Sequence, residues 1–491
     1  MSDGIDKQIL QMYATMNFSA IIPVLIISGG AILLMLTSLL KSARKINEVM
    51  SFVIAAVALF FSIKEWNVEP SAYFNNMIQV DHFSTMATII YIVSVMMIIL
   101  LSSEYLTTRN YQGGEYYSLL FFALSGMIFI TSAGDLITFY LGLETLSISL
   151  YILIAIDTND QRSTEAGLKY FLMSAFSSAF LLYGIALVYG ATGSTSMAEI
   201  KNFVTINSVS STYLVAGSLL LLAGVGFKIS MFPFHMWTPD TYEGAPLSVT
   251  AFISTAPKVA SFAFLFKFYA LLQSSTPYPE LLENILAALA VLTMLFGNFL
   301  ALNQSNIKRL LASSSITHMG YVLIALAAHN KQGLEAAMFY FIAYVFMNTG
   351  IFALLSKMSR NNDQNLTVEN LNGLSQQKPG ISLILMLFLF TLSGMPPTVG
   401  FFAKFYIFNA AIEAKMYGLA VLGILNSAIS AYYYLRIIVA IYMKPANEKP
   451  EMEFAAIRYG WQTTVIIAIA LIFVIMAGVM PDKIIGSVTG L

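Results

Sequence analysis

The chain has 491 residues, of which 58% are hydrophobic and only 10% are charged, and its mean hydropathy is +0.75. Soluble domains carry roughly 25% charged residues, so this composition predicts an integral membrane protein. The net charge of −1 provides no basic face for nucleic acid, and the absence of cysteine excludes disulfides and thiolate-held iron–sulfur clusters in this chain.

Long apolar runs follow one another along the whole chain. A membrane-spanning helix needs about 20 apolar residues, and short polar segments separate roughly fourteen such runs. We therefore predict an all-α polytopic membrane protein with about 14 transmembrane helices in a single domain, residues 1–491. The runs cover residues 17–40, 49–63, 84–103, 115–133, 135–157, 164–191, 211–239, 247–273, 280–302, 305–328, 334–357, 379–411, 418–443 and 461–480.

The basic residues are distributed unevenly between alternate loops. Cytoplasmic loops carry an excess of lysine and arginine, so the richer side is predicted to be cytoplasmic and both termini periplasmic. The sparser side holds Lys7, Lys64, Lys201, Lys331, Lys415 and Lys483. The richer side holds Lys41, Arg44, Lys45, Arg109, Arg162, Lys308, Arg309, Lys357, Arg360, Lys378, Lys444, Lys449 and Arg458.

Two short sequence matches indicate an internal repeat. YILIAI at residues 151–156 returns as YVLIAL at 321–326, and EAGLKYF at 165–171 returns as EAAMFYF at 335–341, both at an offset of 170. This offset spans five predicted helices, so predicted helices 4–8 (residues 115–273) match helices 9–13 (280–443). Because five is odd, the two units enter the membrane from opposite sides, which predicts an inverted repeat of the kind found in ion-coupled transporters.

Prolines interrupt predicted helices 7 and 12, which occupy matching positions in the two repeats. The first interruption is GVGFKISMFPFHMWTPDTYEGAP, with Pro233 and Pro239, and the second is SGMPPTVGFFAKFYIF, with Pro396 and Pro397. An interior proline removes a backbone hydrogen bond and breaks or kinks the helix. Kinks that only improve packing are the alternative, but paired breaks, each beside a lysine, favour helices that line a transport site.

Four charged residues lie deep within predicted helices: Glu144, Lys228, Lys258 and Lys404. Isolated charges are costly inside a membrane and usually mark ion or proton pathways. The alternative is a buried ion pair that only fixes helix register. Burial disfavours the charged form of a side chain and a nearby opposite charge favours it, so making and breaking a Glu144–Lys228 contact is predicted to switch Lys228 between holding and releasing a proton.

The two repeats differ in their charged residues. At the 170 offset Glu144 matches Ser314 and Lys169 matches Phe339, so the acid belongs to the first half and the second half relies on Lys404.

Three further residues are candidate relays between the lysines. His235 and His318 can exchange protons near neutral pH, although a histidine bonded to a hydroxyl in a helix interface is an equally good interpretation. Lys169 is another stepping stone, or else an i,i+4 ion pair with Glu165.

Three polar residues follow the first interruption, namely Asp240, Tyr242 and Glu243. They form either a proton input funnel or a solvated loop.

Four motifs together resemble the antiporter-like membrane subunits of respiratory complex I, and most of all the subunit N type. They are FKISMFPFHMWTPDTYEGAP, FGNFLALNQSNIKRLLASSSITHMGYVLIAL, SGMPPTVGFFAKFYIF and AYYYLRI. The resemblance covers nearly the whole chain from about predicted helix 3 onward. A lysine at 404 is similar to subunit N, whereas subunit M usually has a glutamate there.

The resemblance implies fourteen helices, two inverted five-helix repeats with broken helices 7 and 12, and proton translocation without a redox centre. It assigns translocation to Glu144, Lys228, Lys258 and Lys404. It also implies subunit M, small membrane subunits and lipid as partners, with quinone, FMN and iron–sulfur clusters confined to other subunits of a bacterial inner-membrane complex.

A subunit of a multisubunit cation/proton antiporter is the alternative from another class, since that family shares the fold and needs no redox partner. A sodium site requires several clustered oxygen ligands, and few membrane-embedded carboxylates accompany Glu144. A purely structural membrane scaffold is the third choice, which the buried charges disfavour.

Overall fold

The structure is a computed structural model that describes residues 18–40, 44–66, 69–108, 113–206, 212–272, 278–359, 366–445 and 460–489. Both chain termini, whose side of the membrane the charges predict, lie outside the described residues. So do residue 17 of the first predicted run and the basic residues Lys7, Lys41, Arg109, Arg360, Lys449 and Arg458.

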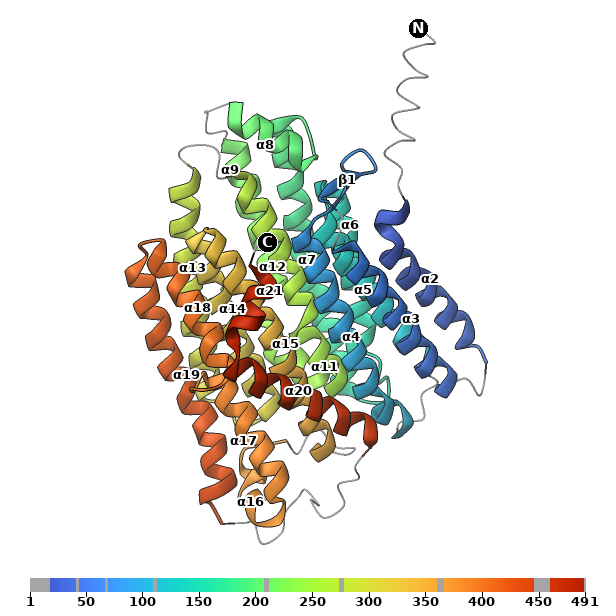
Figure 1. Ribbon diagram of the computed structural model, residues 1–491, viewed down its shortest axis with the longest axis vertical. Helices are drawn as coiled ribbons and strands as arrows, with labels where there is room; N and C mark the ends of the chain where they lie inside the picture. The colour runs from blue at the N-terminus through green and yellow to red at the C-terminus, as the bar shows by residue number, and fades with distance from the viewer. Residues whose placement is uncertain are drawn as a thin grey trace.

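Helices make up most of the described chain (Figure 1). Eleven helical segments in these ranges, one of them Leu247–Leu272, are long and apolar enough to cross a membrane, so the chain is a multi-pass membrane protein. The helices of the bundle are α2 (Ile22–Thr37), α3 (Arg44–Glu65), α4 (His82–Thr108), α5 (Gly114–Ser132), α6 (Leu136–Ile154), α7 (Gln161–Thr192), α9 (Thr212–Lys228), α10 (Trp237–Gly244), α11 (Leu247–Ser254), α12 (Ala256–Leu272), α13 (Tyr278–Leu302), α14 (Ile307–Ala328), α15 (Lys331–Ser359), α17 (Pro379–Ser393), α18 (Val399–Glu413), α19 (Tyr417–Met443) and α20 (Trp461–Val479).

Several smaller elements connect or cap these helices, and the hydropathy pattern does not predict them because they are short. The antiparallel strands β1 and β2 and helix α8 lie at one end of the bundle, and α16 lies at the other end (Figure 1). These elements are η1 (Phe18–Ile21), β1 (Ser71–Tyr73), β2 (Ile78–Val80), α8 (Met197–Ile206), η3 (Glu369–Leu371), α16 (Leu374–Gln377) and α21 (Pro481–Val488).

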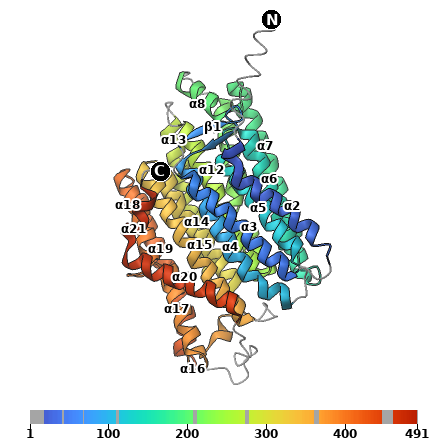
Figure 2. The ribbon, with the colours of Figure 1, turned by 45° about the vertical axis from the view of Figure 1, so that its right-hand side comes forward.

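The chain crosses the bundle from α2 and α3 at one edge to α18 and α19 at the other, and α20 runs obliquely over the surface (Figures 1 and 2). Helix α20 contacts α4, α15 and α18. The most apolar windows of α14 and of the α11–α12 segment are completely buried within the chain. Polar side chains on these central helices are therefore shielded from lipid.

The prolines break two predicted helices as expected. Residues 211–239 divide into α9 and α10, and residues 379–411 divide into α17 and α18. Pro233, Pro396 and Pro397 lie within the interruptions, whereas Pro239 lies in the first turn of α10. A proline is tolerated there because its missing N–H would have no helical partner in the first turn.

A third interruption lies in residues 247–273, whose apolar run predicts one continuous helix. Residues 247–273 divide at Thr255 into α11 and α12, where the backbone adopts φ −117° and ψ −101°. Pro257 cannot donate to the carbonyl of Ile253, which weakens the helix at this point. The Thr255 hydroxyl donates to the carbonyls of Ala251 (2.9 Å) and Phe252 (3.1 Å). The break brings Lys258 into the first turn of a new helix.

Two helix pairs each pack closely at a glycine. A side chain at Gly126 on α5 would collide with the backbone of Gly142 and Leu146 on α6. A side chain at Gly297 on α13 would collide with Ser313 and Thr317 on α14. Both pairs therefore need the close backbone approach that glycine permits.

The residues that begin α6 and α14 are also held alike. Asp135 caps α6 and forms a β-bridge with Ser196, while Asn306 caps α14 and forms a β-bridge with Thr367. Each bridge therefore ties the start of one helix to the loop that follows the next long helix.

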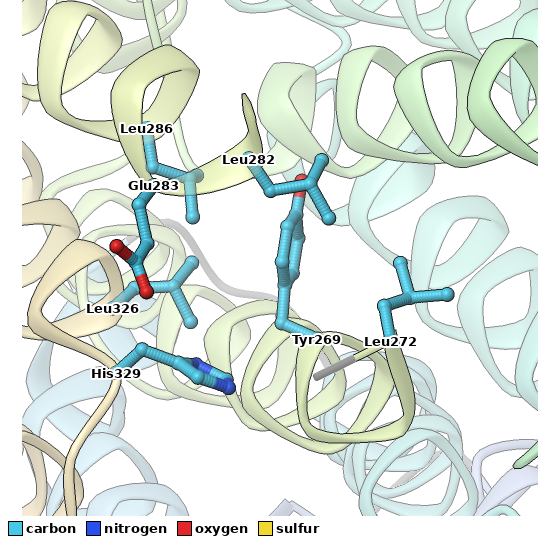
Figure 3. A pocket seen from close by; sticks show the side chains of 7 residues that line it. All are labelled: Tyr269, Leu272, Leu282, Glu283, Leu286, Leu326 and His329. Atoms are coloured by element: carbon cyan, nitrogen blue, oxygen red, sulfur yellow. The ribbon is translucent and has the colours of Figure 1, made fainter. Parts of the chain in front are cut away.

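A small cavity of about 10 Å³ lies between α12, α13 and the end of α14. Four leucines line most of it, and Glu283 and His329 reach into it (Figure 3). His329 is the residue after α14 and has φ +46°, a conformation that asparagine adopts more readily than most residues. Burial lowers the pKa of His329 to about 4, so its side chain is neutral at neutral pH.

The buried His329 predicts a loss of stability in acid. Its pKa in the unfolded chain is about 6.5, so between pH 6.5 and 4 the unfolded state binds more protons and stability falls as the pH falls. We expect His329→Asn to reduce the drop in melting temperature between pH 7 and pH 4.5 by a few degrees. Thermal unfolding of the purified protein in detergent measures this, and equal drops in both proteins would contradict it.

Candidate functional site

Lys228 is the last residue of α9 and lies beside the first interruption. The C-terminus of a helix carries partial negative charge, which stabilises an ammonium group. The Nζ of Lys228 donates to the hydroxyls of Ser147 (2.7 Å) and Ser174 (2.5 Å). It also lies 5.4 Å from the centre of the Tyr170 ring, within the range of a cation–π contact. The break in the helix thus produces a buried site for a positive charge.

Glu144 lies on α6 near this lysine but does not touch it. Its Oε1 accepts a 2.5 Å hydrogen bond from Ser178. No ion pair within 4.0 Å in the described part of the chain joins Glu144 to Lys228. The predicted contact between Glu144 and Lys228 is therefore not made in this structure, and each group binds serine hydroxyls instead.

These hydroxyls come from the two helices that flank α9. Ser147 follows Glu144 by about one turn on α6, and Ser174 precedes Ser178 by about one turn on α7. A serine hydroxyl donates one hydrogen bond and accepts two. Ser178, which binds the acid, therefore lies one turn from Ser174, which binds the lysine.

Lys258 lies at the centre of the bundle on α12 and is 1% exposed. Its Nζ donates to the hydroxyl of Ser315 on α14 at 2.7 Å. The hydroxyl of Tyr344 on α15 donates to the same serine at 2.9 Å, and that of Tyr242 on α10 lies 3.4 Å away. Ser315 therefore joins four different helices around one ammonium group.

His318 lies one turn beyond Ser315 on α14 and is also buried. Its Nδ1 is 2.5 Å from the hydroxyl of Tyr340, and its Nε2 is 3.0 Å from that of Tyr434. The ring of Tyr321 packs edge-on against the imidazole. Both ring nitrogens have hydroxyl neighbours, so this histidine can accept a proton at one nitrogen and release one at the other.

Lys404 lies on α18, and its ammonium group reaches the second interruption. Its Nζ donates to the carbonyl of Ser393 (2.8 Å), the last residue of α17, and to the hydroxyl of Ser427 on α19 (2.9 Å). It also lies 5.0 Å from the centre of the Tyr321 ring. Lys404 and Lys228 therefore both place their charge at the C-terminus of a half-helix.

The remaining relay candidates lie elsewhere. His235 is buried within the first interruption, where it stacks on Phe232, and its Nδ1 has no hydrogen-bond partner among the described residues. Lys169 is 47% exposed and pairs with Glu165 (2.7 Å) and Asp240 (3.3 Å). The i,i+4 pair considered for Lys169 is present, and neither residue contacts a buried lysine through an observed hydrogen bond.

A charged cluster holds α10 against α14. Arg309 donates to Asp240 (2.8 Å) and Glu243 (2.7 Å), and Lys308 donates to the carbonyl of Ala245 (2.7 Å). Tyr242, between the two acids, is completely buried. Asp240 and Glu243 therefore belong to helix α10 instead of a solvated loop, and ion pairs hold both to the second half of the chain.

Removing the guanidinium from this cluster should destabilise the chain, because Asp240 and Glu243 would then face each other unpaired. We expect Arg309→Ala to lower the unfolding free energy by about 1–2 kcal/mol, since the group is partly exposed. Thermal melting in detergent measures the effect. Lys331→Ala, which removes an exposed pair with Glu335 at 3.8 Å, is the control and should change stability by less than about 0.5 kcal/mol. Adding Glu243→Gln to Arg309→Ala should restore part of the loss, and no restoration would contradict this explanation.

The sequence pattern does not identify the hydroxyl groups that form hydrogen bonds with the charged residues and with their partners. Serines and tyrosines are common in apolar helices and have no charge to mark them, but several recur one turn apart from a candidate. Ser147 follows Glu144 at helical spacing, and Ser315 precedes His318 in the same way. The connecting residues are Ser147, Ser174, Ser178, Ser315, Tyr340, Tyr344, Ser427 and Tyr434.

The donors in this site suit protons better than metal ions. The described residues include no group of three or more histidine, aspartate or glutamate side chains arranged to hold a metal. Lys228, Lys258 and Lys404 instead donate to serine hydroxyls.

Comparisons with known proteins identify the family of this chain. A family model described as NADH:quinone oxidoreductase/Mrp antiporter, TM, matches residues 133–430. NADH-quinone oxidoreductase subunit N of Trichlorobacter lovleyi is 41% identical over 90% of this chain and 91% of its own. The Myxococcus xanthus protein of the same name is 35% identical over 96% of both chains.

Two solved structures have similar folds. A chain of respiratory complex I from Thermus thermophilus superimposes with a TM-score of 0.79 and 31% identity, covering 95% of this chain and 99% of that one. A chain of the Mrp complex from Dietzia superimposes with a TM-score of 0.84 at 17% identity over 96% of both chains, a likeness of fold alone.

Proposed function

The chain belongs to the NADH:quinone oxidoreductase/Mrp antiporter membrane family and within it to the subunit N type, and from this premise we propose that it translocates protons in the membrane arm of respiratory complex I. Its partners are the other membrane subunits of that complex, including the antiporter-like subunit M. Quinone reduction in partner subunits drives the translocation. The chain itself is a subunit of the enzyme complex, and the proposal assigns FMN, quinone and iron–sulfur clusters to other subunits.

The observation that carries the proposal is the set of three buried lysines, each hydrogen-bonded to hydroxyls at a break or at the centre of the bundle. In the proposed path a proton enters from the cytoplasm near α10 and α12 and is held at Lys228. It then passes through waters to Lys258 and leaves by way of Lys404. His318, whose aromatic neighbours Tyr344 and Tyr321 are also those of the two lysine sites, is the relay between Lys258 and Lys404.

Glu144 controls the charge of Lys228 in this scheme. Because Ser147, Ser174 and Ser178 lie between them, we propose that the acid acts through the orientation of these hydroxyls as well as through its own charge. The driving signal reaches this site from neighbouring subunits as an electrostatic and conformational change.

We also propose that the chain is one domain of about 14 transmembrane helices with inverted repeats at residues 115–273 and 280–443. The two bridges support this, since Asp135 to Asn306 and Ser196 to Thr367 are both separations of 171. The glycine pair Gly126 and Gly297 has the same separation. This register matches Glu144 to Ser315 instead of Ser314, so the position of the acid in one half corresponds to the acceptor of Lys258 in the other.

The location that follows is the bacterial inner membrane, with both termini on the periplasmic side. The excess of basic residues on one set of loops supports this orientation.

Copurification tests the proposal. The chain is tagged at its C-terminus, native membranes are solubilised in mild detergent, and the associated proteins are identified by mass spectrometry. Iron–sulfur and quinone-site subunits are the expected partners. Recovery of small membrane antiporter subunits alone would instead support the cation/proton antiporter function that the shared family allows.

A further inference from the structure

A second polar site lies away from the lysines, where the starts of α2 and α4 meet the ends of α3 and α5 beside strand β2. It is a cavity of about 20 Å³. A water-sized guest needs about 10–15 Å³, so the cavity has room for one small ion or water molecule. None of its lining residues belongs to the proposed proton path.

Glu65, at the end of α3, is the one acidic residue among those that line this cavity. Its Oε1 is buried and has no hydrogen-bond partner among the described residues. None of the ion pairs within 4.0 Å in these ranges includes Glu65. A buried carboxylate oxygen without a partner is costly, so we expect a hydrogen-bond donor or a positive species to accompany it.

The other polar residues that line the cavity carry hydroxyl groups. The hydroxyls of Thr88 and Ser132 donate their hydrogens to the carbonyls of Ser84 and Ile128, each at 2.8 Å. Their oxygens therefore keep lone pairs free to bind a guest. Ser84 and Thr85 add two further hydroxyls to the lining.

This donor set distinguishes between the positive species that could neutralise Glu65. A proton on the carboxylate needs only one acceptor, whereas the cavity supplies several oxygens. Hard cations prefer ligands of carboxylate, carbonyl and hydroxyl oxygen, and a single carboxylate matches a charge of one. We propose that Glu65, Thr88 and Ser132 bind a sodium ion that joins the end of α3 to α4 and α5.

Sodium binding to the purified full-length chain tests this inference. We expect saturable binding of ²²Na⁺ in equilibrium dialysis against choline chloride at constant ionic strength, and a higher melting temperature in NaCl than in choline chloride. Glu65→Gln should abolish both effects. Glu69→Gln, which alters an exposed acid nearby, is the matched control and should bind as the native chain does.

Thr88→Val provides a second variant of similar shape in case Glu65→Gln does not fold, and it should weaken sodium binding at least tenfold. Native-like binding by a folded Glu65→Gln or Thr88→Val protein, or no binding by the native chain, would overturn the proposal. A Lys228→Met variant should still bind sodium, so the failure of this inference is distinguishable from the failure of the proposed proton path.

Discussion

Replacing Lys228 by methionine is expected to decrease proton translocation by about tenfold or more, equivalent to at least about 1.4 kcal/mol in the limiting barrier. Methionine has a similar volume but holds no proton, so the link from Ser147 and Ser174 to the rest of the path is lost. Proton uptake and NADH oxidation are measured together in inverted membrane vesicles. Their ratio reports the protons moved per electron.

Lys169→Met is the matched control for this experiment, because Lys169 lies on neighbouring α7 but is half-exposed and paired at the surface. Its removal should change the ratio by less than about twofold, as expected for the loss of exposed ion pairs. A native ratio of protons to electrons in the Lys228→Met vesicles would contradict the proposed path.

Removing the charge at the second interruption should have an effect of similar size. Lys404→Met leaves the carbonyl of Ser393 and the hydroxyl of Ser427 without their donor and eliminates the proposed exit. We expect about a tenfold or greater fall in proton translocation, measured in the same vesicles. Lys404→Arg, which keeps a charge but releases protons poorly, should be nearly as inactive.

Gly394 offers an independent perturbation of the same lysine. Its φ is +82°, and a Cβ there would lie 2.9 Å from Cδ of Lys404 and 3.1 Å from Nζ. Gly394→Ala should therefore displace the ammonium from Ser393 and lower proton translocation while Lys404 remains in place. Gly380→Ala, where the added Cβ meets nothing within 4 Å, is the control. Equal activity of Gly394→Ala and Gly380→Ala would show that the position of Lys404 does not matter.

The helices and two of the three interruptions were predictable because their causes are local. Apolar runs specify membrane helices, and Pro233, Pro396 and Pro397 each remove a backbone donor whatever surrounds them. The division at Thr255 does not follow from the apolar pattern, because residues 247–273 read as one apolar segment, although Pro257 lies beside the break.

The charged candidates were also predictable, since lysine and glutamate are rare in membrane helices. Their contacts were not, because a hydrogen bond between Lys228 and Ser174 joins residues 54 positions apart and depends on how α7 and α9 pack. The same reason explains the repeat register. The similar sequences at residues 151–156 and 321–326 indicate an offset of 170. The β-bridges and the glycine contacts instead support an offset of 171 for the proposed repeat.

The serines beside Lys228 have a consequence for the order of events. While Lys228 donates to Ser147, that hydroxyl points its only hydrogen at the carbonyl of Leu143, and Ser174 receives a second hydrogen from Tyr151. A hydroxyl that accepts a proton on one side and releases its own on the other is left with its hydrogen pointing in the opposite direction. In the proposed path such a hydroxyl must turn back before it can pass another proton, so we expect protons to follow one at a time.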